Sequence, residues 1–169
     1  MAEKNNIILI GMPGAGKSTL GVVAAKMLGM DFLDADLLIQ SQMDSTLHKI
    51  IDAMGPDGFL QVENRVLGDV DCQNTVVSTG GSAVYSSEAM KHLASIGTVV
   101  YLKVSLEELE GRLGSLHERG VVMREGMGNN LAALYHERVP LYEAYADITV
   151  DTEGMSTREA AEALVAALG

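Results

Sequence analysis

The chain has 169 residues, of which 47% are hydrophobic, and a single cysteine, Cys72. Its length fits one globular domain with a sizeable core, and a single cysteine excludes an internal disulfide and a cysteine-rich metal site. The formal net charge of −11 argues against a nucleic-acid partner or an acidic membrane surface. Because the chain begins without a signal-peptide pattern and no apolar run reaches the length of a membrane span, we expect a cytoplasmic protein.

Apolar runs and helical patterns alternate along the chain. Strands are expected at 6–10, 31–34, 75–78, 98–103 and 147–151. Helices are expected at 17–28, 35–43, 46–54, 57–70, 86–95, 106–115, 129–145 and 157–168. Two helix starts have the spacing of a capping box, Ser105 with Glu108 and Ser156 with Glu159. This alternation predicts an α/β fold, a parallel sheet with helices on both faces, in one domain over 1–169.

The first strand leads into a glycine-rich segment, Gly11-Met12-Pro13-Gly14-Ala15-Gly16-Lys17-Ser18, followed by Thr19 and a helix. The segment fits G-x-x-x-x-G-K-[ST], the P-loop that surrounds a polyphosphate with backbone N–H groups. Lys17 is expected to contact the outer phosphates, and the Ser18 hydroxyl is expected to bind Mg²⁺. An ordinary glycine-rich turn is the alternative, but the strand before the segment and the helix after it favour the P-loop.

Two aspartates, Asp34 and Asp36, lie at the end of the second strand. Ligands of open α/β sheets bind at the carboxyl ends of the strands, so both are expected beside the P-loop. If the strand continues, alternation points both carboxylates the same way. Asp34 is then placed to hold Mg²⁺ through water, and Asp36 to bind a substrate hydroxyl and act as its base. The alternative for either residue is an N-cap of the next helix.

The third strand ends in Thr79-Gly80-Gly81-Ser82. Two adjacent glycines would let the backbone approach a ligand closely, whereas a plain strand-to-helix turn is the alternative. These residues are candidates for the substrate site.

Residues 116–128 interrupt the alternation with three glycines and two arginines, Arg119 and Arg124. A charged, glycine-bearing stretch between two helices predicts a mobile lid, with a plain connection as the alternative. Arg119 is a candidate to stabilise the transferring phosphoryl group, whereas solvation at the surface is the preferred interpretation of Arg124. Arg112, just before the lid, is placed to stack on adenine, with a surface role equally open.

In this order, the motifs resemble the shikimate kinase family of P-loop kinases over nearly the whole chain. The resemblance rests on the segment from Gly11 to Thr19, on Asp34 and Asp36, and on the late segment Leu134 to Thr152. It implies a three-layer α/β/α fold with a central five-stranded parallel sheet in the order 2-3-1-4-5 and a lid. It also implies ATP and Mg²⁺ as cofactors.

The same resemblance implies roles for individual residues. Asp34 matches a Mg²⁺-binding residue, and Asp36 matches the residue that binds the substrate hydroxyl. Arg119 corresponds to the lid arginine, and Arg138 aligns with an arginine that binds the shikimate carboxylate.

Departures from the family pattern concentrate at the acceptor site. The family motif G-E-x-x-F-R-x-x-E reads Gly-Pro-Asp-Gly-Phe-Leu-Gln-Val-Glu at residues 55–63, so Leu60 replaces an arginine that binds the shikimate carboxylate. Ser82 replaces the third glycine of the family's glycine turn, and the lid lacks the family's proline. Arg124 or Arg65 could supply the missing charge, although Arg65 lies about 140° around a helix from Leu60.

The leading hypothesis is therefore an enzyme that phosphorylates a hydroxyl of shikimate with ATP, a step of aromatic amino-acid biosynthesis. Lys17, Asp36 and Arg119 are its expected catalytic residues. A kinase of the same fold acting on a polyol or sugar acid is the first alternative, because Leu60 and Ser82 alter the carboxylate side. A nucleotide-binding regulatory module without turnover is the second. We expect a monomer that binds a small-molecule substrate.

Overall fold

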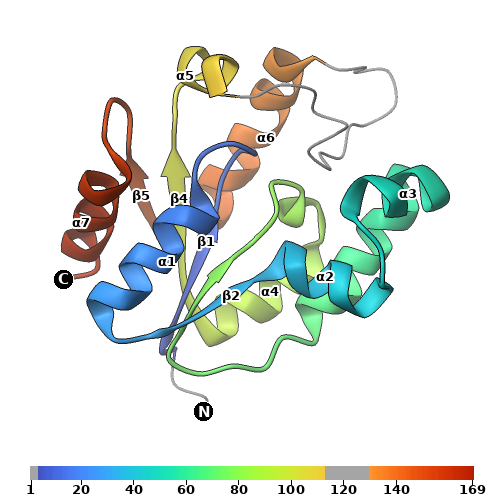
Figure 1. The fold of residues 1–169 in the computed structure, drawn as a ribbon, viewed down its shortest axis with the longest axis horizontal. Helices are drawn as coiled ribbons and strands as arrows, with labels where there is room; N and C mark the ends of the chain where they lie inside the picture. The colour runs from blue at the N-terminus through green and yellow to red at the C-terminus, as the bar shows by residue number, and fades with distance from the viewer. Residues whose placement is uncertain (1–3, 113–129) are drawn as a thin grey trace.

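The computed structural model describes residues 4–112 and 130–169, and within these ranges five strands form a parallel sheet (Figure 1). The strands are β1 (Asn6–Ile10), β2 (Asp31–Asp34), β3 (Thr75–Ser78), β4 (Gly97–Lys103) and β5 (Ile148–Asp151). They lie in the order β2-β3-β1-β4-β5, which confirms the expected order. Strand β1 therefore lies at the centre, hydrogen-bonded to β3 on one side and β4 on the other.

Helices cover both faces of the sheet, as the alternating pattern predicted. On one face, Ile7 and Leu9 pack against α1 (Lys17–Leu28) and α7 (Thr157–Ala167). On the other, Ile8 and Ile10 belong to a cluster that includes residues of α3 (Leu47–Gly68), α4 (Ser87–Ile96) and α6 (Leu131–Tyr145). Successive side chains of a strand point to opposite faces, so β1 contributes to both cores. The three-layer α/β/α arrangement is confirmed.

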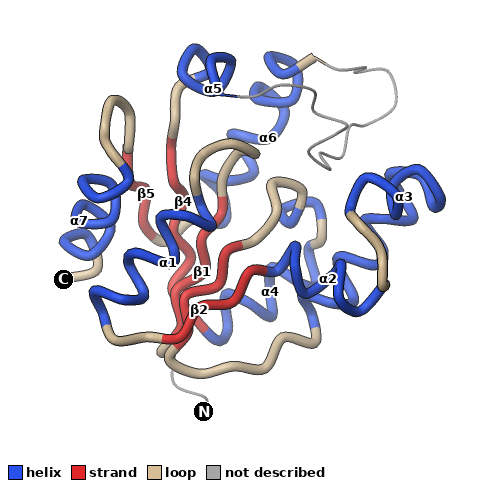
Figure 2. Tube along the Cα trace, in the orientation of Figure 1, coloured by secondary structure: helices blue, strands red, loops and turns tan. Residues whose placement is uncertain are grey.

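A lobe of two helices adjoins the β2 edge of the sheet. Figure 2 shows α2 (Ala35–Met43) continuing directly from the end of β2, and α2 contacts α3. The lobe has its own apolar cluster, with Ile39, Ile50 and Phe59 buried in it. Gly55 has a φ of 77° and interrupts α3 just before Pro56, so the helices expected at 46–54 and 57–70 are its two halves. The glycine permits a backbone conformation that would strain other residues.

Several element boundaries differ slightly from the sequence expectation. Strand β4 begins one residue earlier and β5 one residue later than expected, and a short 3₁₀ helix, η1 (Ala83–Tyr85), was not predicted. Helix α6 begins at Leu131 because the Asn130 side chain accepts a hydrogen bond from the Ala133 N–H, as an N-cap does. Helix α5 (Leu106–Arg112) is the described part of the helix expected at 106–115. The expected lid at 116–128 lies outside the described residues.

One of the two predicted capping boxes is complete. The Ser156 hydroxyl accepts from the Glu159 N–H, and the Glu159 carboxylate accepts from the Ser156 N–H. Ser105 accepts from the Glu108 N–H at 3.2 Å, but the Glu108 carboxylate contacts Arg112 instead. Over residues 4–112 and 130–169, no helix is both long and apolar enough to cross a membrane.

Candidate active site

The segment between β1 and α1 forms a tight loop with unusual backbone angles. Gly16 is the N-cap of α1 and has a φ of 88°, in the left-handed region that favours glycine. At Gly11, a Cβ atom would lie 2.8 Å from the carbonyl oxygen of Leu102 in β4, so a side chain does not fit. This loop therefore requires the glycines at 11 and 16. Gly16, the last residue of the loop, directly precedes the N-terminus of α1, where anions bind favourably.

Lys17 is buried, and its ammonium group lies inside the loop. Its Nζ donates hydrogen bonds to the carbonyl oxygens of Gly11 and Met12, at 2.7 and 2.8 Å. Burial lowers the pKa of Lys17 to about 8, and the negative charge of Asp36 opposes this shift. The loop thus holds a buried cation where a polyphosphate is expected to bind.

Three oxygen-bearing side chains meet beside the loop. The Ser18 hydroxyl donates to Oδ2 of Asp34 at 2.8 Å and lies 3.1 Å from the hydroxyl of Ser78 at the end of β3. The other carboxylate oxygen of Asp34 accepts from the N–H groups of Asp36 and Leu37, which makes Asp34 the N-cap of α2. The N-cap interpretation of Asp34 is therefore confirmed, and the other carboxylate oxygen, in contact with Ser18, is the one that the expected Mg²⁺ role would use.

Asp36 lies in the first turn of α2 rather than in β2, so strand alternation does not explain its direction. The structure nevertheless places it in the expected location. Asp36 shares a cavity of about 240 Å³ with P-loop residues that include Lys17, and with Gly80 and Gly81. The pKa of Asp36 is raised to about 6, mainly by burial, although the positive charge of Lys17 acts in the opposite direction. Asp36 can therefore accept a hydrogen bond or a proton within this cavity.

Gly80 and Gly81 allow close approach of side chains. A Cβ atom on Gly80 would lie 2.6 Å from Oδ1 of Asp36. One on Gly81 would lie 2.7 Å from Cδ of Pro13 and 3.0 Å from Nη1 of Arg138. The glycine pair therefore lets the P-loop, Asp36 and Arg138 converge, which a turn built from larger residues would prevent.

Arg138 comes from α6 and is almost fully buried, with 1% of its surface exposed. Its Nε donates to the hydroxyl of Tyr85 at 3.3 Å, and its guanidinium lies 5.2 Å from the centre of the Tyr85 ring. The Tyr85 hydroxyl in turn donates to Glu137. This packing fixes the plane of a guanidinium, the group best suited to bind a carboxylate through two hydrogen bonds.

The two residues that depart from the family pattern lie in different surroundings. Leu60 is half-buried and lines a second cavity of about 280 Å³, together with Gln61, Asn64 and Tyr85. Ser82 is buried, and its hydroxyl donates to Oε1 of Glu63 at 2.8 Å. The extra side chain at residue 82 thus contacts a carboxyl group of α3.

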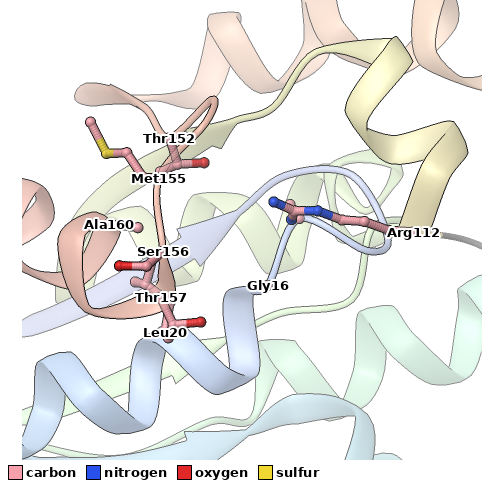
Figure 3. A pocket seen from close by; sticks show the side chains of 9 residues that line it. Gly16, Leu20, Arg112, Thr152, Met155, Ser156, Thr157 and Ala160 are labelled. Atoms are coloured by element: carbon pink, nitrogen blue, oxygen red, sulfur yellow. The ribbon is translucent and has the colours of Figure 1, made fainter.

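Arg112 contributes to a further cavity, of about 100 Å³, which Gly16 of the P-loop also lines (Figure 3). Its Nη1 donates to the carbonyl oxygen of Gly14 at 3.0 Å. Thr152, Met155 and Thr157, from the end of β5 to the start of α7, line the same cavity. A guanidinium next to a partly apolar cavity can stack on a planar base.

Two of the predicted arginines, Arg119 and Arg124, lie outside the described residues. Arg65 is described and contacts Sδ of Met43 at 3.8 Å. It is among the residues of neither the 240 Å³ nor the 280 Å³ cavity, which agrees with the helix geometry expected from the sequence.

Several neighbours of the site were not identified from the sequence: Ser78, Tyr85, Glu63 as a partner of Ser82, and the segment 152–157. Ser78 could have been found from its position at the carboxyl end of β3. The pairing of Ser82 with Glu63 joins two elements that are far apart in sequence and has no local signal.

Comparison with known proteins gives a consistent result. The family model described as shikimate kinase matches residues 13–169. The shikimate kinase of Actinobacillus pleuropneumoniae serotype 5b is 40% identical over 159 residues, which cover 94% of this chain and 92% of that protein. That of Pasteurella multocida is 40% identical over 98% of this chain and 95% of its own length.

Solved structures agree with this result. The shikimate kinase of Acinetobacter baumannii, determined in complex with shikimate, superposes with a TM-score of 0.86 at 32% identity, covering 96% of this chain and 91% of that one. A match to the family model over most of the chain, relatives at 40% identity and a structural neighbour with a TM-score of 0.86 together identify the family. The chain belongs to the shikimate kinase family.

Proposed function

We propose that this chain transfers the γ-phosphoryl group of ATP to a hydroxyl group of shikimate. The observation that carries the proposal is the single cavity in which P-loop residues, including Lys17, face Asp36 and Gly80. A phosphate donor bound by the P-loop and an acceptor bound by Asp36 would share this cavity. The acceptor is proposed from the family, and from a relative whose structure contains shikimate.

The residues present also fit a magnesium ion. Hydroxyl and carboxylate oxygens are the ligands that Mg²⁺ prefers, and Ser18 and Asp34 supply one of each in contact. Within the described residues there is no group of three His, Cys, Asp or Glu that could hold a metal, which suits an ion that keeps several waters and phosphate oxygens. When bound, Mg²⁺ would neutralise charge on the β- and γ-phosphates.

The transfer itself needs an oriented hydroxyl and a stabilised phosphoryl group. Asp36 accepts the hydrogen bond of the acceptor hydroxyl and takes its proton as the oxygen bonds to the γ-phosphorus. The bond between that phosphorus and the β–γ bridging oxygen breaks, and ADP leaves with the bonding electrons. Lys17 stabilises the negative charge on the phosphoryl oxygens, and Arg119 of the expected lid is proposed as a second cation.

The remaining described residues bind the two substrates. Arg138, held against Tyr85, is proposed to bind the carboxylate of shikimate. Arg112 and the segment 152–157 are proposed to hold the adenine base. We also propose a monomeric enzyme, the state expected from the sequence.

An acceptor panel tests the proposal. Purified protein with ATP and Mg²⁺ is supplied separately with shikimate, quinate, gluconate or an inositol, and ADP release is measured. Saturable turnover is expected with shikimate. Lys17→Met, which removes the P-loop ammonium, should reduce kcat at least about 100-fold. Efficient turnover with another acceptor and none with shikimate would contradict the proposal.

A further inference from the structure

The carboxyl group of Glu63 is fully buried and only half satisfied. Its Oε1 accepts the hydrogen bond of Ser82, whereas Oε2 has no hydrogen-bond partner among the described residues. Buried polar atoms are almost always hydrogen-bonded, so an exception calls for a physical explanation. The position of Oε2 supplies one.

Two carboxyl groups meet at Gly80. A Cβ atom on this glycine would lie 2.6 Å from Oδ1 of Asp36 and 3.2 Å from Oε2 of Glu63. The two oxygen atoms thus lie close to the same point, Glu63 being fully buried and Asp36 half-buried. Two carboxylates so placed do not both ionise readily, because their charges repel and Glu63 is shielded from water.

The surroundings determine which group keeps its proton. Asp36, from α2, shares its cavity with Lys17. Around Glu63, the charged groups are Asp36 and Arg138 of α6, while Leu60 lies one turn before it on α3. Burial raises the pKa of Glu63 to about 8; the Ser82 hydrogen bond and Arg138 lower it, and Asp36 raises it further. Glu63 is therefore the protonated member of the pair.

We propose that Glu63 is a neutral carboxylic acid and a positioning residue for Asp36. Its carbonyl oxygen Oε1 accepts from Ser82, and its hydroxyl oxygen Oε2 faces Asp36 across Gly80. A neutral carboxyl group costs less to bury without a partner than a carboxylate does, and its O–H lies on the side of Gly80 where Oδ1 of Asp36 also lies. One negative charge, that of Asp36, remains at the acceptor end of the cavity.

This assignment links the two departures from the family pattern. Residues three apart on a helix are neighbours, so an arginine at residue 60 would lie within reach of Glu63 and favour its ionised form. With leucine at residue 60, no arginine favours the ionised form of Glu63. The neutral carboxyl group of Glu63 and the hydroxyl group of Ser82 then pair with each other without any charge. The role for Asp36 rests on the proposed function, whereas the protonation state of Glu63 does not.

Infrared spectroscopy tests the protonation state directly. At pH 7, the difference spectrum between the native protein and Glu63→Gln should contain the carbonyl stretch of a neutral carboxylic acid. The band should weaken in Leu60→Arg and move to higher frequency in Ser82→Ala, which removes the hydrogen bond to Oε1. A difference spectrum that shows an ionised carboxylate instead would overturn the proposal. An unchanged band in Ser82→Ala would also count against it, and this variant needs no change at Glu63.

Kinetics test the positioning role. Glu63→Gln lowers kcat/KM for shikimate by a factor that should be at least tenfold larger in the Leu60→Arg background than in the native chain. Only in the Leu60→Arg background would Gln replace an ionised partner of the arginine. Equal costs in folded proteins would overturn the proposal. Absence of any shikimate turnover would instead refute the proposed function, and the infrared result would still decide the state of Glu63.

Discussion

Asp34 uses its two carboxylate oxygens for different tasks: Oδ2 accepts from the Ser18 hydroxyl at 2.8 Å, and Oδ1 caps helix α2. Substitutions can therefore separate structure from chemistry. Asparagine is as good an N-cap as aspartate but carries no charge, so Asp34→Asn should keep the melting temperature while kcat and the apparent Mg²⁺ affinity fall at least about tenfold. Asp34→Ala should lose about 1 kcal/mol of stability as well. A native Mg²⁺ dependence in Asp34→Asn would exclude a metal role.

Arg138 is expected to control acceptor affinity. Removal of a buried cation from a carboxylate typically costs about 2–5 kcal/mol, so Arg138→Met should raise KM for shikimate roughly 30-fold or more. The KM of Arg138→Lys should lie between those of the native protein and Arg138→Met, because lysine keeps the charge but lacks the planar group that packs on Tyr85. Steady-state kinetics at saturating ATP measure both variants, with thermal unfolding as the check on folding. An unchanged KM in folded Arg138→Met would place the carboxylate elsewhere.

Gly80 is expected to be intolerant of any side chain. The added methyl group of Gly80→Ala would meet Oδ1 of Asp36, so the carboxylate must move and kcat should fall at least about tenfold. Gly68→Ala, in α3, is the matched control, since nothing lies within 4 Å of its Cβ position. The control should be as active as the native protein and up to about 1 kcal/mol more stable. Similar activities for the two variants would refute the steric argument.

The stability of the protein should depend on pH through Glu63. Its pKa is about 8 in the folded protein against 4.5 for the unperturbed group, so folding favours the protonated form. The contribution to the free energy of unfolding is fully present below pH 4.5 and is lost as the pH rises through 8. Glu63→Gln stays neutral, so urea unfolding should show its stability rising relative to the native protein from pH 5 to pH 8.5.

The matched control for this trend is Glu159→Gln. The hydrogen bonds of Ser156 lower the pKa of Glu159, so this exposed carboxylate is ionised in both folded and unfolded chains above pH 5. Its substitution should change stability by the same amount at every pH in the range. If the difference in the free energy of unfolding between Glu63→Gln and the native protein were also independent of pH, Glu63 would have an ordinary pKa.

The sequence predicted the sheet and its helices well because the signals are local. Apolar runs mark the strands, and the glycines of the P-loop impose a backbone that few other sequences adopt. Asp34 and Asp36 were placed beside the P-loop as expected, although Asp36 belongs to a helix, because both lie within two residues of the carboxyl end of β2. The contact between Ser82 and Glu63 could not be predicted, since it depends on how α3 packs against the turn after β3. The wall of the Arg112 cavity likewise comes from chain far away in sequence.

The bonds from Lys17 to the carbonyl oxygens of Gly11 and Met12 have a consequence for nucleotide binding. A buried ammonium without partners is costly, and these two oxygens reduce that cost. An ammonium group has three N–H donors, so one remains to donate to a phosphate oxygen. The loop therefore holds the cation in place through its own backbone, and binding of a nucleotide need not immobilise a flexible lysine side chain.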